Sequence, residues 1–199
     1  MGNKCWMAEN LNYDDGCGLA SFSEDPGQAN WCGCYDNNSS SCDIFGKLYQ
    51  WRAAMKESES EEAQGICPDG WHIPDEDEID EMIDYVTTNY SDHGCITKSL
   101  ASQYNWIPCC EGFCTSDICY YGSPAFMSER NNVSGLSFIP SGWRDPGGTY
   151  GQLYSYSTLW SSSLVSYPNV FAFRFYRSGE VLDFYNEYLS FALSVRCIK

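Results

Sequence analysis

The chain has 199 residues, of which 27 are Asp or Glu and 11 are Lys or Arg, so its formal net charge is −16. This acidic balance argues against nucleic acid or an anionic membrane surface as a partner, because both attract basic proteins. No window approaches the roughly 18 to 20 consecutive apolar residues of a membrane span, so we expect no membrane insertion.

The cysteine content points to an oxidising compartment. The chain has twelve cysteines, an even number that is typical of extracellular or periplasmic disulfide-bonded proteins. Zinc is the alternative, but zinc needs paired ligands at short spacing. Cys32 with Cys34 and the run 109–119 come nearest, and no two matched pairs occur, so we favour disulfides and a secreted or surface-displayed protein. Met1–Asn12 lacks the features of a signal peptide, so we expect the export leader to lie outside this sequence.

The first predicted feature along the chain is a cysteine-rich insertion near residues 14–42. Asp14–Ser41 is rich in Gly, Asn, Asp and Ser and has almost no aliphatic residues, which is typical of loops. Disulfides can hold such a segment where a hydrophobic core cannot. Cys34 and Cys42 are among the predicted disulfide cysteines, and the pairing within the segment stays open for Cys17, Cys32, Cys34 and Cys42.

Two amphipathic helices are predicted next. From Phe45 to Lys56, apolar residues at three- and four-residue spacing indicate a helix that faces the core: Leu48, Trp51, Ala54 and Met55. Pro74 is expected to open the second helix, whose buried stripe is Ile79, Met82, Ile83 and Val86. Its first turn is acidic, which the helix dipole favours. The alternative for these acids is a calcium or catalytic carboxylate site, formed by Asp75, Glu76, Asp77 and Glu78.

The second half of the chain is expected to be mostly strands. Cys95–Gly122 is another cysteine-dense stretch, predicted as an insertion near residues 95–122. Beyond it, short apolar runs predict strands at 136–140, 158–162, 170–176, 180–184 and 191–197. Phe171, Phe173 and Phe175 alternate on one strand face, and Arg177–Gly179 has the composition of a hairpin turn. Helices before strands predict one α+β domain over 1–199, with a C-terminal antiparallel sheet.

Several motifs occur in an order that resembles a known family. They are Cys5–Tyr13 (CWMAENLNY), Gly46–Met55 (GKLYQWRAAM), Cys67–Pro74 (CPDGWHIP), Ser141–Asp145 (SGWRD) with Leu159–Ser163 (LWSSS), and Ser194–Lys199 (SVRCIK). Together they resemble the Fibrobacter succinogenes major paralogous domain family over essentially the whole chain. The resemblance implies a C-type-lectin-like fold, related to that of the formylglycine-generating enzyme, in secreted and surface proteins of bacteria.

The resemblance also implies a disulfide and argues against catalysis. In the implied fold, a disulfide between Cys67 and Cys197 joins an early helical region to the final strand. Such a bridge contributes about 5 kcal/mol in the chain-entropy model. The family brings no known reaction. The related enzyme uses reactive cysteines near the C-terminal part of the fold, whereas Cys197 is the only cysteine here after Cys119 and is assigned a structural role. We therefore expect that the chain is not an enzyme.

Other groups with catalytic or binding chemistry have simpler explanations. His72 could be a metal ligand or a base, but we expect a packed histidine whose ring nitrogens bond to backbone. No Gly-x-Ser-x-Gly elbow or phosphate-binding glycine loop occurs. Tryptophans could form a carbohydrate platform, although those within the motifs are expected in the core; the residues concerned are Trp6, Trp51, Trp71, Trp106, Trp143 and Trp160.

The segment 150–190 is the predicted binding region. It is rich in Tyr and Ser and contains no Lys, a composition typical of recognition loops because Tyr gives a large contact area at low conformational cost. The alternative is a strand-rich core, in which aromatic residues are also common. Because the side chains of a strand alternate between its two faces, some of the phenylalanines are expected to point inward. The remaining residues are the better surface candidates: Tyr154, Tyr156, Tyr167, Tyr176, Asp183, Tyr185, Asn186 and Tyr188.

Three functions remain open from the sequence. The leading hypothesis is a binding or adhesion module that recognises a glycan or protein on another surface. The alternatives are self-association into an extracellular assembly through the same aromatic surface, and a redox enzyme of the formylglycine-generating type. The segment also resembles the variable regions of target proteins of diversity-generating retroelements, which use this fold. No cofactor is expected; calcium is common in this fold generally, yet no calcium-binding loop can be located in this sequence.

Overall fold

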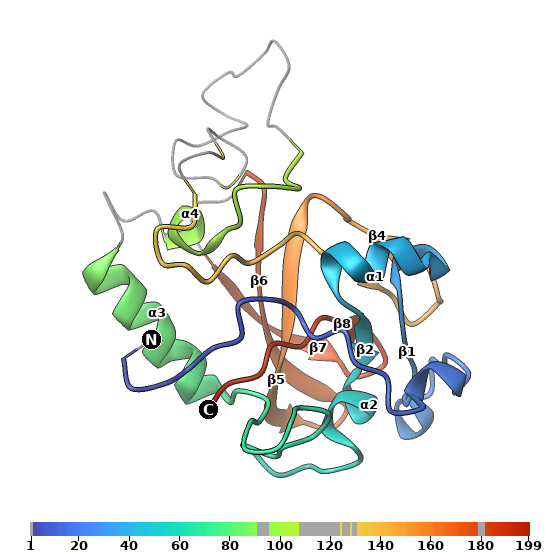
Figure 1. Ribbon diagram of the computed structural model, residues 1–199. Helices are drawn as coiled ribbons and strands as arrows, with labels where there is room; N and C mark the ends of the chain where they lie inside the picture. The colour runs from blue at the N-terminus through green and yellow to red at the C-terminus, as the bar shows by residue number, and fades with distance from the viewer. Residues whose placement is uncertain (1, 91–95, 108–123, 125–127, 129–130, 179–181) are drawn as a thin grey trace.

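The computed structural model describes residues 2–90, 96–107, 124, 128, 131–178 and 182–199. Within these residues the chain has the predicted α+β architecture: helices and two antiparallel sheets (Figure 1). One sheet has the order β1-β2-β8-β3-β4 and the other the order β5-β6-β7. Among the described residues, no helix has the length and apolar content needed to cross a membrane.

The predicted loop at Asp14–Ser41 contains short elements that its composition does not reveal. Three single turns of 3-10 helix, Cys17–Leu19, Pro26–Gln28 and Tyr35–Asn37, surround strand β1 (Cys32–Gly33). Helix α1 (Ser39–Phe45) follows, with the Asn38 side chain accepting a hydrogen bond from the Ser40 amide at its start. Two disulfides hold the segment, Cys17–Cys32 and Cys34–Cys42. Cross-linking therefore stabilises the insertion, as expected.

The helix predicted from Phe45 to Lys56 is wrong in its first half. α1 ends at Phe45, Leu48–Gln50 forms strand β2, and only Trp51–Met55 is helical, as α2. The reason is Gly46, whose φ is +74° and where a Cβ atom would lie 2.8 Å from the Leu11 carbonyl oxygen. This tight contact with a distant segment turns the chain out of the helix, and β2 then pairs with both β1 and β8.

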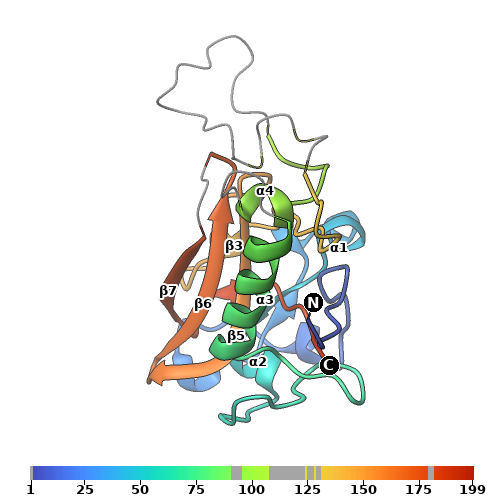
Figure 2. The ribbon, with the colours of Figure 1, turned by 90° about the vertical axis from the view of Figure 1, so that its left-hand side faces the viewer.

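The second predicted helix is confirmed as α3 (Glu76–Asn89), and a short α4 (Ile96–Leu100) follows. Pro74 precedes the helix instead of opening it, because Asp75 is the N-cap and forms a capping box with Glu78. The stripe of Ile79, Met82 and Val86 is buried against the sheet β5-β6-β7, across which α3 lies (Figure 2).

The C-terminal strands carry most of the core. β5 (Tyr156–Ser166), β6 (Asn169–Tyr176) and β7 (Asp183–Tyr188) pair antiparallel, and the Phe171, Phe173 and Phe175 side chains are buried beneath α3 as predicted. β7 begins at Asp183, and residues 179–181 of the predicted turn and strand lie outside the described residues. The run 136–140 contributes only an isolated bridge, between Ala101 and Phe138.

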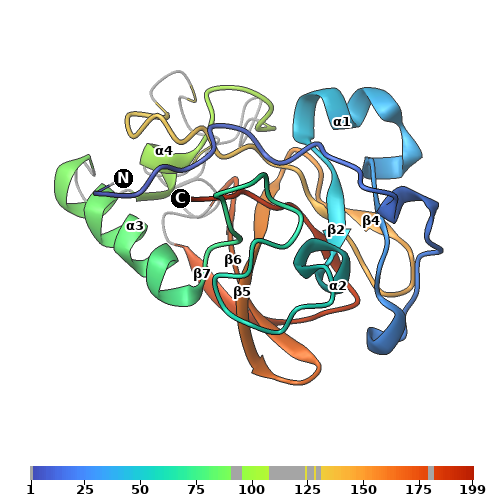
Figure 3. The ribbon, with the colours of Figure 1, turned by 60° about the horizontal axis from the view of Figure 1, so that its bottom comes forward.

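The five-stranded sheet β1-β2-β8-β3-β4 combines strands from the N-terminal and C-terminal parts of the chain. Its remaining strands are β3 (Trp143–Arg144), β4 (Tyr150–Gly151) and β8 (Ala192–Leu193). The N-terminal segment runs beside the C-terminal one (Figure 3), since the Cys5 and Met7 amides donate to the carbonyl oxygens of Lys199 and Cys197. The Cys67–Cys197 disulfide, the pair that the family resemblance implied, ties the segment around Cys67 to the same C-terminal segment.

Two motif tryptophans form the centre of the core, as expected. Trp51 and Trp160 are fully buried, and their indole nitrogens donate to the carbonyl oxygens of Ser161 and Tyr49 at 2.9 and 2.7 Å. Trp106, which lies outside the motifs, is also buried and stacks on Phe175 with ring centroids 5.5 Å apart. These rings therefore serve packing, not ligand stacking.

Candidate ligand-binding surface

Strand register brings part of the predicted binding region together. Tyr156 of β5 pairs with Tyr176 of β6, and Arg174 of β6 pairs with Asp183 of β7. Successive side chains of a strand point to opposite faces of a sheet. Arg174 and Tyr176 therefore lie on the face opposite the phenylalanines that pack against α3. We call this surface the Arg174 face, and it consists of Trp143, Tyr156, Arg174, Tyr176, Asp183 and Tyr185.

A single guanidinium group is at the centre of this face. The Arg174 Cζ atom lies 4.3 Å from the ring centroid of Tyr185 and 5.9 Å from that of Tyr156, within the range of cation–π attraction. Its Nε atom is 3.7 Å from Asp183 Oδ2, too far for a hydrogen bond, and has no hydrogen-bond partner. The Arg174 side chain is 34% exposed. Arg174 is thus held in place by its neighbours: its Nε atom is buried, while the side chain as a whole remains one-third exposed.

Aromatic rings extend the face towards the other sheet. The Tyr156 and Tyr176 rings are stacked, 5.5 Å apart at 28°. Trp143 of β3 meets Tyr156 edge-on, with ring centroids 5.1 Å apart. All three side chains are half-buried. Rings packed in this way lose little conformational freedom when a ligand binds, which favours their use in recognition.

Burial sets the ionisation of the groups at the inner end of the face. Burial raises the pKa of Tyr185, and the nearby Glu187 carboxylate raises it further, so Tyr185 remains a neutral phenol. Burial also raises the pKa of Glu187, against the opposing effects of the Tyr188 amide, which donates to its Oε1, and of Arg174. Tyr185 therefore contributes to the face as a neutral ring and hydroxyl group.

The eight predicted binding residues do not form one patch. Tyr156, Tyr176, Asp183 and Tyr185 share the Arg174 face, whereas Asn186 and Tyr188 point to the opposite face of β7. Tyr154 and Tyr167 lie beyond opposite ends of β5, whose 11 residues span about 33 Å at 3.3 Å per residue. Tyr154 packs instead against Phe45 of α1, with ring centroids 5.4 Å apart.

Arg174 was not among the predicted binding residues, and Trp143, which was expected in the core, packs against the core and also contacts Tyr156. The same alternation that places Phe173 and Phe175 inward puts Arg174 between them on the other face, so the signal for Arg174 was present in the strand pattern. The contact of Trp143 with Tyr156 joins strands from two sheets. No local pattern in the sequence encodes such a contact.

The acidic start of α3 is explained by helix capping and ion pairing. Glu78 is buried, and its carboxylate accepts hydrogen bonds from Lys4, from the Asp75 amide and, at 2.9 Å, from His72 Nε2. His72 is thus packed as expected, but its ring bonds to a carboxylate instead of backbone. Burial alone would raise the pKa of Glu78, but the hydrogen bonds from Lys4 and His72 outweigh it and lower this pKa.

Two of the four acids named as an alternative metal site, Asp75 and Glu78, lie in a cluster of carboxylates with Glu62. Oxygen atoms of Glu62, Asp75 and Glu78 lie within 4.8 Å of one another. Those of Glu78 already accept hydrogen bonds from protein groups, so this residue has little to offer a cation. Asp75 and Glu78 also form the capping box of α3, which is the role that the sequence favoured for the acids at this helix start.

Thiol chemistry is restricted in the part of the chain that the structure describes. Cys17, Cys32, Cys34, Cys42, Cys67 and Cys197 are disulfide-bonded, and Cys5 is free and exposed. The five cysteines of the second predicted insertion, Cys95, Cys109, Cys110, Cys114 and Cys119, lie outside the described residues, as does His93.

Comparison with protein families gives one match. The family model for the Fibrobacter succinogenes major domain matches residues 1–199, the whole chain. Comparison with curated proteins and with solved structures finds no match.

Proposed function

We propose that the chain, which belongs to the Fibrobacter succinogenes major domain family, is a secreted or surface-displayed binding module and not an enzyme. In this proposal the fold is a C-type-lectin-like scaffold, and the Arg174 face recognises a glycan or protein on another surface. The disulfides and the family are compatible with an extracellular module. The module is proposed to work without a cofactor.

The observation that carries the proposal is the state of Arg174. Its side chain is one-third exposed, its guanidinium lies over the Tyr185 ring, and its Asp183 partner is 3.7 Å away. Arg and Tyr are enriched among the residues that dominate binding energies. Since the neighbouring rings already restrict the Arg174 side chain, a ligand group that accepts from it costs little additional ordering.

Two observations support the proposal that the chain is not an enzyme. Chemistry of the formylglycine-generating type needs reactive cysteines, and here the C-terminal Cys197 is bonded to Cys67. His72, the one described histidine, is engaged by Glu78 at the start of α3. Neither group lies on the Arg174 face.

A panel of immobilised glycans and extracellular proteins tests the proposal. The probes are the wild-type protein, a Tyr156→Ala/Tyr176→Ala variant of the Arg174 face, and a matched control, Tyr154→Ala/Tyr167→Ala, whose residues are exposed and lie off that face. We expect ligands that wild type and control retain and the face variant loses, with all three melting within a few degrees of one another. Equal binding by the face variant and wild type would reject the Arg174 face.

Self-association is a second candidate function, and strand β7 favours it. The sheet order β5-β6-β7 leaves one edge of β7 without a strand partner among the described residues, and such edges can pair with another chain. The net charge of −16 opposes association between copies. Light scattering separates the two functions, because a monomer at high concentration excludes assembly.

The retroelement hypothesis concerns how this surface arises. Four members of the Arg174 face that the sequence predicted, Tyr156, Tyr176, Asp183 and Tyr185, come from the segment that resembles a variable region. We propose that the gene lies beside a reverse transcriptase and a template repeat. A genome without both would reject this origin and leave the binding proposal unaffected.

A further inference from the structure

Arg144 of β3 lies among aromatic rings contributed by the cysteine-rich insertion and by β4. Its Cζ atom is 3.8 Å from the ring centroid of Phe22, 4.5 Å from that of Trp31 and 4.9 Å from that of Tyr150, all within the range of cation–π attraction. Tyr150 is also the cross-strand partner of Arg144. Because successive side chains of a strand alternate, Arg144 points away from the Arg174 face, to which its neighbour in β3 belongs.

The surroundings hold this guanidinium in place. Its Nε atom donates to the Gly148 carbonyl oxygen at 3.1 Å. The Phe22 ring meets the Trp31 ring edge-on, with centroids 5.3 Å apart, and the Cys17–Cys32 disulfide closes the loop that carries Phe22. The Arg144 side chain therefore loses little conformational freedom when it binds a ligand.

The outer edge of the guanidinium has no protein partner. In the part of the chain that the structure describes, neither terminal nitrogen of Arg144 forms a hydrogen bond or an ion pair, and neither is among the buried side-chain atoms without a partner. Both nitrogens therefore reach solvent. A Cβ atom at Gly148 would lie 3.4 Å from Nη2, so the glycine keeps a side chain away from that nitrogen. By contrast, Arg52 is paired with Glu57.

The charge around the site favours a singly charged anion. Arg144 is the only Lys, Arg or His in residues 14–42 and 141–151, the two segments that form the site. A guanidinium can bind a carboxylate through two parallel hydrogen bonds. A phosphate dianion carries a second negative charge that neither segment can neutralise, in a chain whose net charge is −16.

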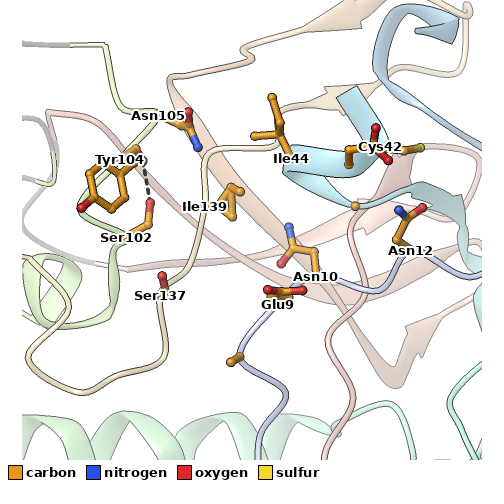
Figure 4. Close-up of a pocket in the computed structure, with 13 residues that line it drawn as sticks. Glu9, Asn10, Asn12, Cys42, Ile44, Ser102, Tyr104, Asn105, Ser137 and Ile139 are labelled. Atoms are coloured by element: carbon orange, nitrogen blue, oxygen red, sulfur yellow. Dashed lines mark hydrogen bonds between the residues drawn. The ribbon is translucent and has the colours of Figure 1, made fainter. Parts of the chain in front are cut away.

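The hollow beside α1 lies apart from this site. Its volume is about 250 Å³, and neither Arg144 nor any of the three rings lines it. Its polar side chains do not converge, because the Tyr104 ring points away from the other lining residues and Asn12 lies at the opposite end of the lining (Figure 4). The rings around Arg144, in contrast, meet at one charged group.

We propose that the outer edge of the Arg144 guanidinium binds the carboxylate group of a ligand. The two terminal nitrogens donate to the two carboxylate oxygens, and the rings hold the guanidinium in position for this contact. This site is separate from the Arg174 face, and its ligand does not depend on what that face recognises.

Nuclear magnetic resonance titration of the wild-type protein tests the assignment. The probes are acetate, methyl glucuronide and N-acetylglycine, which present a carboxylate alone, on a sugar and on an amino acid. Their neutral counterparts are acetamide, methyl glucoside and N-acetylglycinamide, and inorganic phosphate is the competing anion. We expect at least one carboxylate to shift the Arg144 Nε–H and Trp31 indole N–H signals, with a dissociation constant in the millimolar range. Its neutral counterpart should leave them unchanged.

Variants separate the charge of Arg144 from that of the whole chain. Arg144→Gln should weaken this binding at least tenfold, and Arg144→Lys should restore little of it. The matched control is Arg52→Gln, which removes one positive charge from α2 and should leave the binding unchanged.

The wild-type titration decides the question even if Arg144→Gln does not fold. The inference is overturned if no carboxylate shifts the signals, if the neutral counterparts shift them equally, or if phosphate binds more tightly than every carboxylate. It is also overturned if a folded Arg144→Gln variant binds as wild type does.

Discussion

The three disulfides should contribute to stability in the order of the loops that they close. The bridges join residues separated by 130, 15 and 8 positions: Cys67–Cys197, Cys17–Cys32 and Cys34–Cys42. In the chain-entropy model these separations correspond to about 5, about 3 and about 2.5 kcal/mol respectively. Both sulfur-bearing residues of Cys67–Cys197 also belong to the buried core, so loss of this bridge removes packing as well as the cross-link.

Three variants, each with both cysteines of one bridge replaced by Ala, test this order. Urea unfolding followed by tryptophan fluorescence gives the free energy of unfolding and the dependence on denaturant. The Cys67→Ala/Cys197→Ala variant should lose about 5 kcal/mol, or roughly 10 to 20 °C in melting temperature. A smaller loss for this variant than for Cys34→Ala/Cys42→Ala would refute the reasoning, because loop closure would then not govern the contribution of the bridges.

Three further predictions concern the core and the N-terminal ion pairs. Because the pKa of Glu78 is lowered in the folded state, its stabilisation is present above the unfolded pKa near 4.5 and is lost as pH falls through the folded value. The stability difference between wild type and Glu78→Gln should therefore shrink between pH 7 and pH 3 in urea titrations; a difference that is constant with pH would contradict this. Arg196→Met should cost about 3 to 5 kcal/mol, because a buried acceptor left without its donor costs about 1 to 3 kcal/mol and the variant removes the donor of Asn10 Oδ1, of the Leu136 carbonyl oxygen and of the half-buried Ser137 carbonyl oxygen; a loss below 1 kcal/mol in urea unfolding would show that these acceptors find other partners. Phe173→Ala should cost about 3 to 5 kcal/mol, whereas Phe184→Ala, at a position 42% exposed on the same sheet face, should cost less than half as much; equal melting temperatures would contradict the assignment of the core.

Local patterns in the sequence predicted the elements whose determinants are local. The acids and the apolar stripe of α3 lie within one segment, and the alternation of Phe171, Phe173 and Phe175 identifies β6 and its buried face. The prediction of a helix from Phe45 was wrong because Gly46 lies against the backbone of Leu11 and the chain cannot stay helical there. This contact joins segments 35 positions apart, so no local pattern reveals it. α1 was missed because it begins with three serines, a residue more typical of caps and loops than of helix interiors.

The candidate binding surface depends even more strongly on contacts between distant segments. Composition pointed to the segment that contributes most of the Arg174 face, but the face itself depends on strand register and on Trp143 from the other sheet. The rings around Arg144 come from the insertion and from β4, and no local pattern in either segment reveals their contact. Recognition surfaces of this kind are formed by tertiary contacts. For this reason only four of the eight predicted binding residues lie on the same face.

The most direct test of the account is the affinity of Arg174 variants for a ligand that the binding panel identifies. The account predicts that Arg174→Gln weakens binding by about 2 kcal/mol or more, roughly thirtyfold, while the melting temperature stays close to that of wild type. Arg174→Lys should restore little of this loss, because an ammonium group lacks the planar fork of a guanidinium. A dissociation constant that Arg174→Gln leaves unchanged, in a protein that remains folded, would contradict the claim that this face is the recognition surface.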